Sequence, residues 1–515
     1  MRLETRHLLD RSFSGLGFVA IFFMAASLVV ILLPIIVKGL SAYLFTGTIE
    51  FREAMNDQFD HGDRAAVQAE ARLAEQARQP LYDCLTAFAD GQSKQLDRLT
   101  AIAQGMAARE DSLGRSVARK MRRFDPQAPF SSQLKTLQGV YDRAAANRGA
   151  VDVVDELAEM NTILAGLSTL NEKVEAFEHA LSELLGPLPG QTPPRLLRSQ
   201  YGQTRWDRAL IKQRQFLFEE EWVHPPDGAP SYIKETPRIE HFRGTALEPA
   251  FALIEHDLES MLRPKFTFYW RFLTDTSKDA NFFGGIWAEV LGTFYLTLGA
   301  MLFAVPMGVI AAIYLCEYAK PSRFISFLRT CISTLAGVPS IVFGLFGLAF
   351  FLNTLEVSHN KSVLAGSMTL ALMILPTIIR ASEEAILAVP QTYKEAALGL
   401  GAGRWHTVLT VVLPASLPGI LTGIVISMGR AAGETAPIIF TAAVSVGQPL
   451  SIFKAFSQPT PALPWNIYNL CTEHEAVNEL RHVQFGMVFT LVAMVLILNL
   501  SAIILRAKVS KKLRG

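Results

Sequence analysis

The sequence predicts an all-α membrane protein with six transmembrane helices and a large helical insert between the first two. Two observations lead to this fold class. Half of the 515 residues are apolar, and they gather in long stretches that carry no charge at all. Residues 39–280 are instead rich in charged side chains, Gln and Ala, which is typical of a water-exposed helical domain.

The candidate spans are uncharged stretches of a length that can cross a bilayer core, which takes about 20 helical residues. They are residues 12–37, 290–316, 330–355, 362–379, 407–429 and 483–505. Helices this uniformly apolar have no polar face to turn towards water, so we expect them in the membrane. Arg430 and Glu434 are expected inside the continuation of the fifth span rather than at its end.

The first span is interpreted as a retained anchor. Its apolar core is longer than that of a cleaved signal peptide, and no clear cleavage site of small residues follows Lys38.

Basic residues predict the orientation. They precede the first span and fill the C-terminal tail, and they are Arg2, Arg6, Arg11, Arg506, Lys508, Lys511, Lys512 and Arg514. The positive-inside rule therefore places both termini in the cytoplasm. With six spans, residues 39–280, 356–361 and 447–482 are expected outside the membrane, and residues 317–322 and 380–406 inside.

These patterns divide the chain into four expected parts. They are a cytoplasmic tail with the first span at 1–38, an external helical insert at 39–280, a five-span core at 281–506 and a basic tail at 507–515.

Within the insert, apolar residues recur every three or four positions over 153–185, as in a helical hairpin or coiled coil. Pro-rich loops are expected around Pro193 and Pro226. A basic cluster at 115–123 is read first as a solvated helix face, with contact to anions or lipid headgroups as the alternative.

The most specific motif lies in the inside loop between the fourth and fifth spans. It consists of Glu395, Ala396, Ala397, Gly401, Val411, Leu413 and Pro414. We expect two short helices joined by a turn at Gly401, because glycine adopts backbone angles that other residues avoid. The residues expected to project into the cytoplasm as a rigid knob are Lys394, Glu395, Arg404, Trp405 and His406. The spacing resembles the EAA signature of ABC importer permeases, EAA-x3-G-x9-I-x-LP, with Val411 in place of Ile.

Four further segments resemble the PstA-type permease of phosphate ABC transporters. They are residues 284–318, 336–342, 375–384 and 430–437, which look like its entry helix, the following span, the approach to the EAA loop and its fifth span. The resemblance covers residues 281–506, whereas the long insert departs from the compact family pattern. It implies the type I ABC importer permease fold and a place in the bacterial inner membrane.

The resemblance also implies partners. These are a second homologous permease, an ABC ATPase dimer that docks on the EAA loop, and a periplasmic phosphate-binding protein, all at a lipid bilayer. The sequence itself contains no GxxxxGK[ST] phosphate loop, so we expect no enzymatic activity and no cofactor in this chain.

Composition excludes other classes. The net charge of +1 gives no reason to expect a nucleic-acid partner. The four cysteines form no CxxC pair and predict neither a metal site nor a disulfide framework, although Cys84 and Cys471 are expected on the same side and leave one bridge open.

Two alternative functions stay open. The cargo could be another oxyanion, sulfate or molybdate. The chain could also be a membrane-anchored sensor that uses the external coiled coil. This alternative fits less well, because a sensor needs only one or two spans and the sequence has six.

The expected substrate pathway rests on charged residues near the spans. A charge deep in a helix is costly and usually faces a bundle interior or a water path, as we expect for Arg430. Glu434 lies one turn further on and can pair with it. A guanidinium group suits phosphate, and Thr435 belongs to the same motif. Arg380, at the inner end of the fourth span, is a weaker candidate for the exit of the substrate pathway. Basic residues at the inner ends of spans often only set the orientation of the helix in the membrane.

Overall fold

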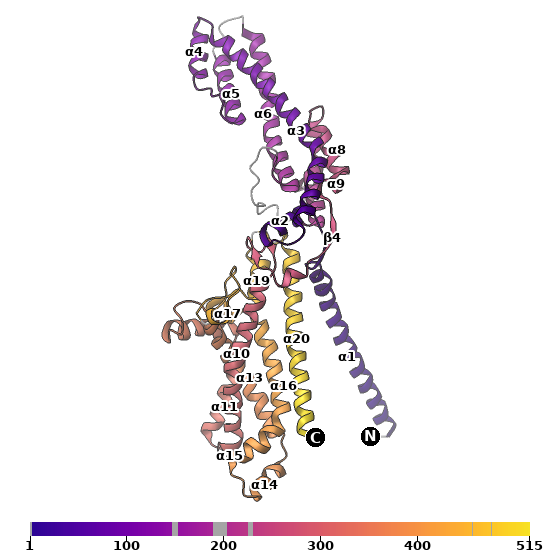
Figure 1. Cartoon of the computed structure of the whole chain (residues 1–515), viewed down its shortest axis with the longest axis vertical. Coiled ribbons are helices and arrows are strands. Elements are labelled where there is room, and N and C mark those ends of the chain that lie inside the picture. The colour runs from indigo at the N-terminus through magenta and orange to yellow at the C-terminus, as the bar shows by residue number, and fades with distance from the viewer. Residues whose placement is uncertain are drawn as a thin grey trace. The chain divides into compact units, whose positions relative to one another are not determined.

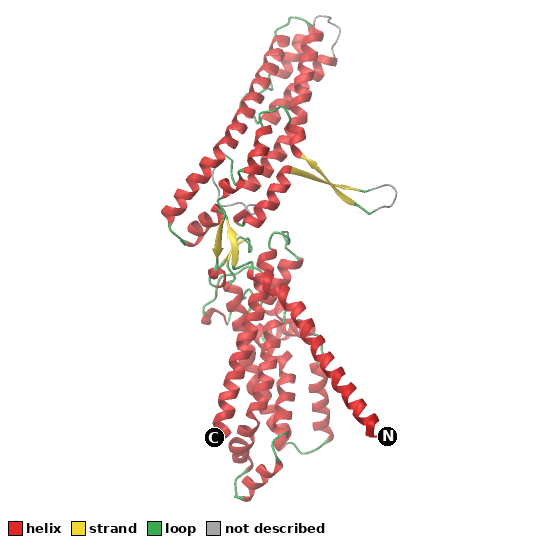
Figure 2. Cartoon of the chain, turned by 90° about the vertical axis from the view of Figure 1, so that its right-hand side faces the viewer, coloured by secondary structure: helices red, strands yellow, loops and turns green. Residues whose placement is uncertain are grey.

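The structure is a computed structural model that describes residues 3–146, 153–188, 203–224, 230–455, 457–474 and 476–514 (Figures 1 and 2). Arg2, Pro193 and Pro226 lie outside these residues. The chain packs as two units. We call Met1–Phe45 with Thr267–Gly515 the membrane unit, and Thr46–Phe266 the insert unit.

The membrane unit contains the apolar helices. Among the described residues, five helical segments are long and apolar enough to cross a membrane. Their main helices are α1 (Leu3–Leu40), α10 (Trp287–Ile313), α13 (Val363–Leu387), α16 (Leu413–Gly433) and α20 (Arg481–Arg514). A π-helical turn at Tyr314–Tyr318 extends α10.

The third expected span, 330–355, is not one straight helix. The structure has α11 (Arg323–Ala336) and α12 (Ser340–Gly347), which continues through a π-helical turn at Leu348–Thr354. The two parts meet at an angle of 101°. The break falls at Pro339, which has no N–H to donate and disfavours helical angles in the residue before it. Counting this bent pair as one span gives six.

The ends of the membrane unit agree with an even number of crossings. Figure 1 shows the N-terminal end of α1, the C-terminal end of α20 and the segment with α14 (Gln391–Gly399) and α15 (Arg404–Thr407) at the same end of this unit. The three segments lie at the same end if the bent pair α11–α12 crosses the membrane once, which gives six crossings in total.

Small residues let the central helices approach closely, as is usual for helices packed in membranes. A Cβ atom added at Gly299 of α10 would lie 2.3 Å from the Oγ of Ser367 on α13. One added at Gly423 of α16 would lie 2.3 Å from the Cβ of Ala381 on α13. The three helices α10, α13 and α16 therefore form the core of the membrane unit.

The remaining elements of the membrane unit are short. They are the strands β5 (Ser277–Lys278) and β6 (Phe283–Gly284), which pair antiparallel, and the helices α17 (Ala436–Thr441), α18 (Ile452–Ala455) and α19 (Leu463–Thr472). Strands β1 (Leu44–Gly47) and β4 (Lys265–Phe268) contain the division between the two units.

The insert unit is a helical bundle with one antiparallel hairpin. Its helices are α2 (Ile49–Phe59), α3 (Arg64–Ala107), α4 (Ser112–Met121), α5 (Phe130–Ala146), α6 (Val154–Leu185), α7 (Trp206–Leu217), α8 (Glu248–His256) and α9 (Leu258–Leu262). The hairpin pairs β2 (Phe218–Val223) with β3 (Tyr232–Pro237).

The apolar seam expected at 153–185 is helix α6, and most of its apolar residues are buried. The seam serves two separate cores rather than one partner helix. Leu157 and Leu164 pack with residues of α4 and α5, whereas Phe177 and Leu181 pack with residues of α7 and α8. Val154 is the exception, because its side chain is exposed.

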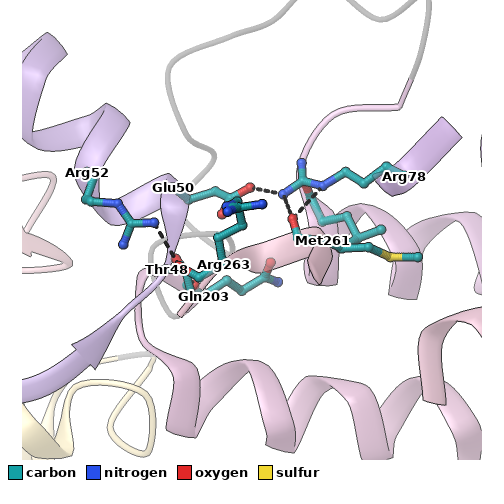
Figure 3. Close-up of polar contacts among 8 residues, drawn as sticks. Thr48, Glu50, Arg52, Arg78, Gln203, Met261 and Arg263 are labelled. Atoms are coloured by element: carbon teal, nitrogen blue, oxygen red, sulfur yellow. Dashed lines mark hydrogen bonds and ion pairs between the residues drawn. The ribbon is translucent and has the colours of Figure 1, made fainter. Parts of the chain in front are cut away.

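A buried arginine ties four helices of the insert unit together (Figure 3). Arg78 of α3 forms an ion pair with Glu50 of α2 at 2.5 Å. It also donates hydrogen bonds to the backbone oxygen of Met261 in α9, at 2.8 and 3.1 Å, and to that of Leu185 at the end of α6, at 3.0 Å. One guanidinium group therefore pairs with one oxygen of a buried carboxylate and with two backbone carbonyl groups.

Replacing Arg78 with Met is expected to destabilise the insert unit by about 3–5 kcal/mol, because it leaves a buried carboxylate without its counter-charge. Arg98→Met on the same helix is the matched control. Arg98 pairs with Glu159, but its side chain is 68% exposed, so about 1 kcal/mol or less is expected. The urea dependence of proteolysis of the full-length chain measures both. Equal shifts would contradict the structural role of Arg78.

Candidate functional site

The EAA segment forms two short helices joined by a sharp turn, as the spacing predicts. Helix α14 ends at Gly399, and α15 begins at Arg404. Between them, Gly401 has a φ angle of +87°, in the region that favours glycine.

Two backbone hydrogen bonds explain the spacing between the EAA triplet and the glycine. The N–H of Gly401 donates to the oxygen of Leu398 at 2.9 Å, and the N–H of Ala402 donates to that of Ala397 at 3.1 Å. This pair of bonds is the Schellman motif, in which the N–H of a left-handed residue bonds to the carbonyl three positions earlier and the next N–H bonds to the carbonyl five positions earlier. Ala397 therefore begins the helix-terminating turn in which Gly401 is the left-handed residue, and this fixes the spacing between them.

The two helices present an exposed surface. No residue of α14 is buried, and Glu395 and Ala396 are exposed, while Ala397 is partly buried. Trp405 of α15 is exposed as well. In an isolated chain, such a surface of aromatic, charged and small residues is suited to contact with another protein.

Lys394 does not project outwards, contrary to the sequence-based expectation. Its ammonium group lies 2.5 Å from the carboxylate of Glu317, and the two side chains are only 12% and 15% exposed. Glu317 belongs to the π-helical turn that ends the α10 segment. The pair therefore anchors α14 to α10, a contact between residues 77 positions apart.

Leu413 and Pro414 stand where the loop joins the fifth span. Helix α15, a π-helical turn at Val408–Val412 and α16 form one apolar segment from Arg404 to Gly433. Pro414 lacks an N–H and its ring crowds the carbonyl four residues earlier, which gives a physical reason for the wider turn before it. Both residues are partly buried.

Helix α16 ends at Gly433, so the expected continuation of the fifth span through Glu434 is wrong. Glu434 has extended backbone angles, and a new short helix, α17, begins at Ala436. The expected ion pair nevertheless forms, with 3.3 Å between Arg430 Nε and Glu434 Oε1. The Arg430 side chain is 41% exposed and the Glu434 side chain 21%.

The break in α16 lies well inside the bundle rather than at its rim. Ala431, next to Arg430, packs in the same apolar cluster as Ala304 in the interior of α10 and Ile374 in the interior of α13. Arg430 follows Gly423 by seven residues, about 10 Å along the helix axis. Discontinuous helices at such depth offer polar groups that a continuous helix would keep paired.

A second broken element lies beside the first. A Cβ atom added at Gly344 of α12 would lie 2.9 Å from the backbone oxygen of Ala436 at the start of α17. Helix α12 follows the sharp bend at Pro339, and Thr435 immediately precedes α17. The structure therefore brings the motif at 430–437 next to the bent pair.

Arg380 belongs to a different cluster. It contacts Glu383 at 3.6 Å, donates to the backbone oxygen of Arg329 at 3.3 Å and reaches the hydroxyl of Ser333. These partners lie on α11 and α13, so Arg380 ties those two helices together. Among the described residues, it shares no polar partner with Arg430.

Two buried acids were not assigned from the sequence. Glu383 also pairs with Arg329 at 3.5 Å and forms the centre of the Arg380 cluster. Glu289, 1% exposed, accepts a hydrogen bond from Asn466 of α19 at 2.9 Å, across 177 positions. From the sequence, Glu383 is placed only in the segment that resembles the approach to the EAA loop, and Glu289 is given no role. A carboxylate close to an uncharged stretch was the available signal for both.

The sequence has relatives among characterised proteins. Residues 304–515 match the family described as binding-protein-dependent transport system inner membrane component. A probable ABC transporter permease protein of Bacillus subtilis, YqgI, is 35% identical over 257 residues, which cover 47% of this chain and 85% of the relative.

Other relatives are named as phosphate transport permeases. The phosphate transport system permease protein PstA 1 of Mycobacterium tuberculosis H37Rv is 36% identical over 45% of this chain and 73% of its own length. A solved structure of the MetNI methionine ABC transporter, inward facing, aligns with 44% of this chain and 94% of its own at 18% identity and a TM-score of 0.33.

The apolar helices agree with the family description, which is that of an inner membrane component, and with the names of the relatives, which are permease proteins. The chain is therefore a multi-pass membrane protein of the binding-protein-dependent transport system inner membrane component family, and within it a PstA-type permease.

Proposed function

We propose that this chain carries inorganic phosphate into the cell across the bacterial cytoplasmic membrane, driven by ATP hydrolysis on partner subunits. The observation that carries the proposal is the exposed EAA segment, which is rigidly joined to the helix that bears Arg430. The names of the PstA relatives support phosphate as the cargo. The partners in this proposal are an ABC ATPase dimer, a second homologous permease and a periplasmic phosphate-binding protein.

The coupling role belongs to the turn and its flanks. Glu395, Ala396 and Ala397 form the docking face for the ATPase, and Gly401 holds its shape. Leu413 and Pro414 join this face to α16. Two connections then carry a displacement of the docking face into the membrane unit: the Lys394–Glu317 ion pair to α10, and the apolar helical segment 404–433 to Arg430.

The transport cycle is alternating access. ATP binding draws the two docking faces of the paired permeases together and opens the path outwards, and hydrolysis resets it to face inwards. Arg430 offers its guanidinium group to the passing anion, Glu434 limits how tightly the anion is held, and Thr435 lies at the same break. Arg380 is the candidate residue at the cytoplasmic exit of the phosphate pathway.

In the proposed topology both termini and the EAA segment face the cytoplasm, and residues 39–280 lie outside. The positive-inside rule supports this choice. The position of both chain ends beside α14 and α15 is consistent with it.

Exchanging the charges of Lys394 and Glu317 tests the coupling connection. Lys394→Glu and Glu317→Lys each place two like charges in a largely buried contact. We expect either change to reduce ATP-driven uptake by about tenfold, equivalent to about 1.4 kcal/mol. The double variant restores an ion pair and should recover most of the uptake.

The measurement is phosphate uptake into proteoliposomes that contain the permeases and the ATPase, with the binding protein added. Competition by sulfate and molybdate in the same assay tests the cargo. A double variant as poor as the single ones would contradict the proposed role of the pair.

A further inference from the structure

The insert unit contains a concave basic site between α4 and α5. A cavity of about 560 Å³ is lined by Arg119, Lys120, Arg123, Gly139, Asp142, Arg143 and Ala146. We call it the basic pocket. Its lining residues come from two segments of the chain, so it is more than the run of basic residues at 115–123.

The charges of the basic pocket are not balanced within the chain. Four of its side chains are cationic, and Asp142 is the one carboxylate among the lining residues. Within the described part of the chain, none of the four cationic side chains forms an ion pair or a side-chain hydrogen bond, whereas Arg98 and Arg109 of the same unit both pair with acids. Like charges held close together repel, and a bound anion would relieve this.

Packing of the helices, rather than the flexibility of long side chains, brings these charges together. Leu113 and Val117 of α4 are buried in one apolar cluster with Leu137 and Val140 of α5. The backbone positions from which the basic side chains start are therefore set by the hydrophobic core beneath them.

Gly139 adapts the site to one of these side chains. A Cβ atom at this position would lie 2.7 Å from Cε and 2.9 Å from Nζ of Lys120. The ammonium group of Lys120 thus lies against the backbone of α5. It occupies space that the Cβ atom of any other residue at position 139 would take. Glycine inside a helix costs about 0.5–1 kcal/mol relative to alanine. Gly91, Gly105 and Gly166 in other helices of the insert unit have nothing within 4 Å of an added Cβ atom, whereas Gly139 lies against Lys120.

Helix dipoles explain part of the pattern but not its geometry. Arg119 and Lys120 lie in the last turn of α4, and Arg143 lies in the last turn of α5, where cations are favoured. This accounts for basic residues at each helix end. The helix dipole does not explain Arg123, which lies beyond the end of α4, or the position of Gly139 against Lys120.

We propose that the basic pocket binds a phosphate group, carried either by free inorganic phosphate or by an anionic lipid headgroup. Guanidinium groups match phosphate oxygens through paired hydrogen bonds, and the Lys120 ammonium adds a compact point charge. The pocket belongs to the insert unit and is separate from Arg430, so it does not depend on the identity of the transported cargo.

The experiment uses the full-length chain and variants with matched charge. Arg119→Gln with Arg143→Gln removes two charges from the basic pocket. Arg115→Gln with Arg122→Gln removes two charges from the neighbouring surface, outside the lining. Gly139→Ala changes no charge but displaces the Lys120 ammonium group, and it should not impair folding, because alanine favours helix.

Two arms distinguish the source of the phosphate group. In phosphatidylcholine nanodiscs at low ionic strength, where exposed charges are least screened, equilibrium dialysis measures binding of radiolabelled inorganic phosphate. In detergent with added phosphatidylglycerol, native mass spectrometry counts the lipid that stays bound. We expect the pocket variant to lose at least about tenfold in one arm, corresponding to about 1.4 kcal/mol, with a smaller loss for Gly139→Ala.

A loss confined to the inorganic phosphate arm identifies free phosphate, and a loss confined to the lipid arm identifies a headgroup. Equal losses in the pocket variant and the surface variant would show a diffuse electrostatic effect and overturn the proposal. No difference from the unmodified chain in either arm would overturn it as well. Because every comparison is between variants that retain Arg430, binding at the translocation site cancels.

Discussion

Arg430→Gln is expected to reduce ATP-driven phosphate uptake by about 10- to 100-fold, while the chain still inserts and assembles with its ATPase. A hydrogen bond to a charged group contributes about 1.5–3 kcal/mol, and tenfold in rate or binding corresponds to about 1.4 kcal/mol. Arg430 lies in the last turn of α16, next to Ala431, which packs with the interiors of α10 and α13. The Arg430 side chain itself is 41% exposed, so its loss removes a cation from the expected path rather than from a packed contact.

The second variant of this test separates transport from structure. If the Arg430–Glu434 pair only balanced its own charges, replacing both residues with Gln would remove the unpaired carboxylate and restore uptake. We expect the double variant to stay as inactive as the single one. Uptake, membrane level and co-purification of the ATPase are measured together, and recovery in the double variant would refute the transport role of Arg430.

Gly401→Val is expected to uncouple the permease from its ATPase. Valine is branched at Cβ and avoids a φ of +87°, so the turn would be strained by about 1–3 kcal/mol or would rearrange. Steric crowding is not the cause, because nothing lies within 4 Å of a Cβ atom added at this position. We expect uptake and ATPase co-purification to fall by about 5- to 100-fold.

Gly403→Val is the matched control for this prediction. Gly403 lies two residues away in the same turn, is equally open, and has angles of φ −70° and ψ 158° that any residue adopts. Valine at 403 should therefore leave coupling nearly intact. If both variants failed alike, the turn would be sensitive to added bulk rather than to the backbone conformation at position 401.

Much of the membrane unit was predictable because its signals are local. An uncharged stretch of sufficient length predicts a membrane helix whatever its neighbours are, and α1, α10, α13 and α20 appear where the sequence places them. The EAA spacing is local as well, since the bonds that close α14 run between Ala397 and Ala402 and between Leu398 and Gly401.

The two broken helices depended on tertiary packing. An apolar composition cannot distinguish a helix that continues from one that bends, and Pro339 allowed either a kink or a break. The structure ends α16 at Gly433 and packs α17 against α12, where Gly344 leaves room for the backbone of Ala436. The position of Arg430 at a break was therefore not available from the sequence.

What the sequence determined by itself is the set of apolar segments and the turn at Gly401, since each depends on residues within one helix or one turn of the chain. Only the tertiary structure decided which polar groups meet. Lys394 was expected to face outwards because charged residues in loops usually do, but its partner Glu317 lies 77 positions earlier. In the basic pocket, Lys120 likewise lies against Gly139 of the next helix. Such contacts arise when helices pack, and no local pattern of residues encodes them.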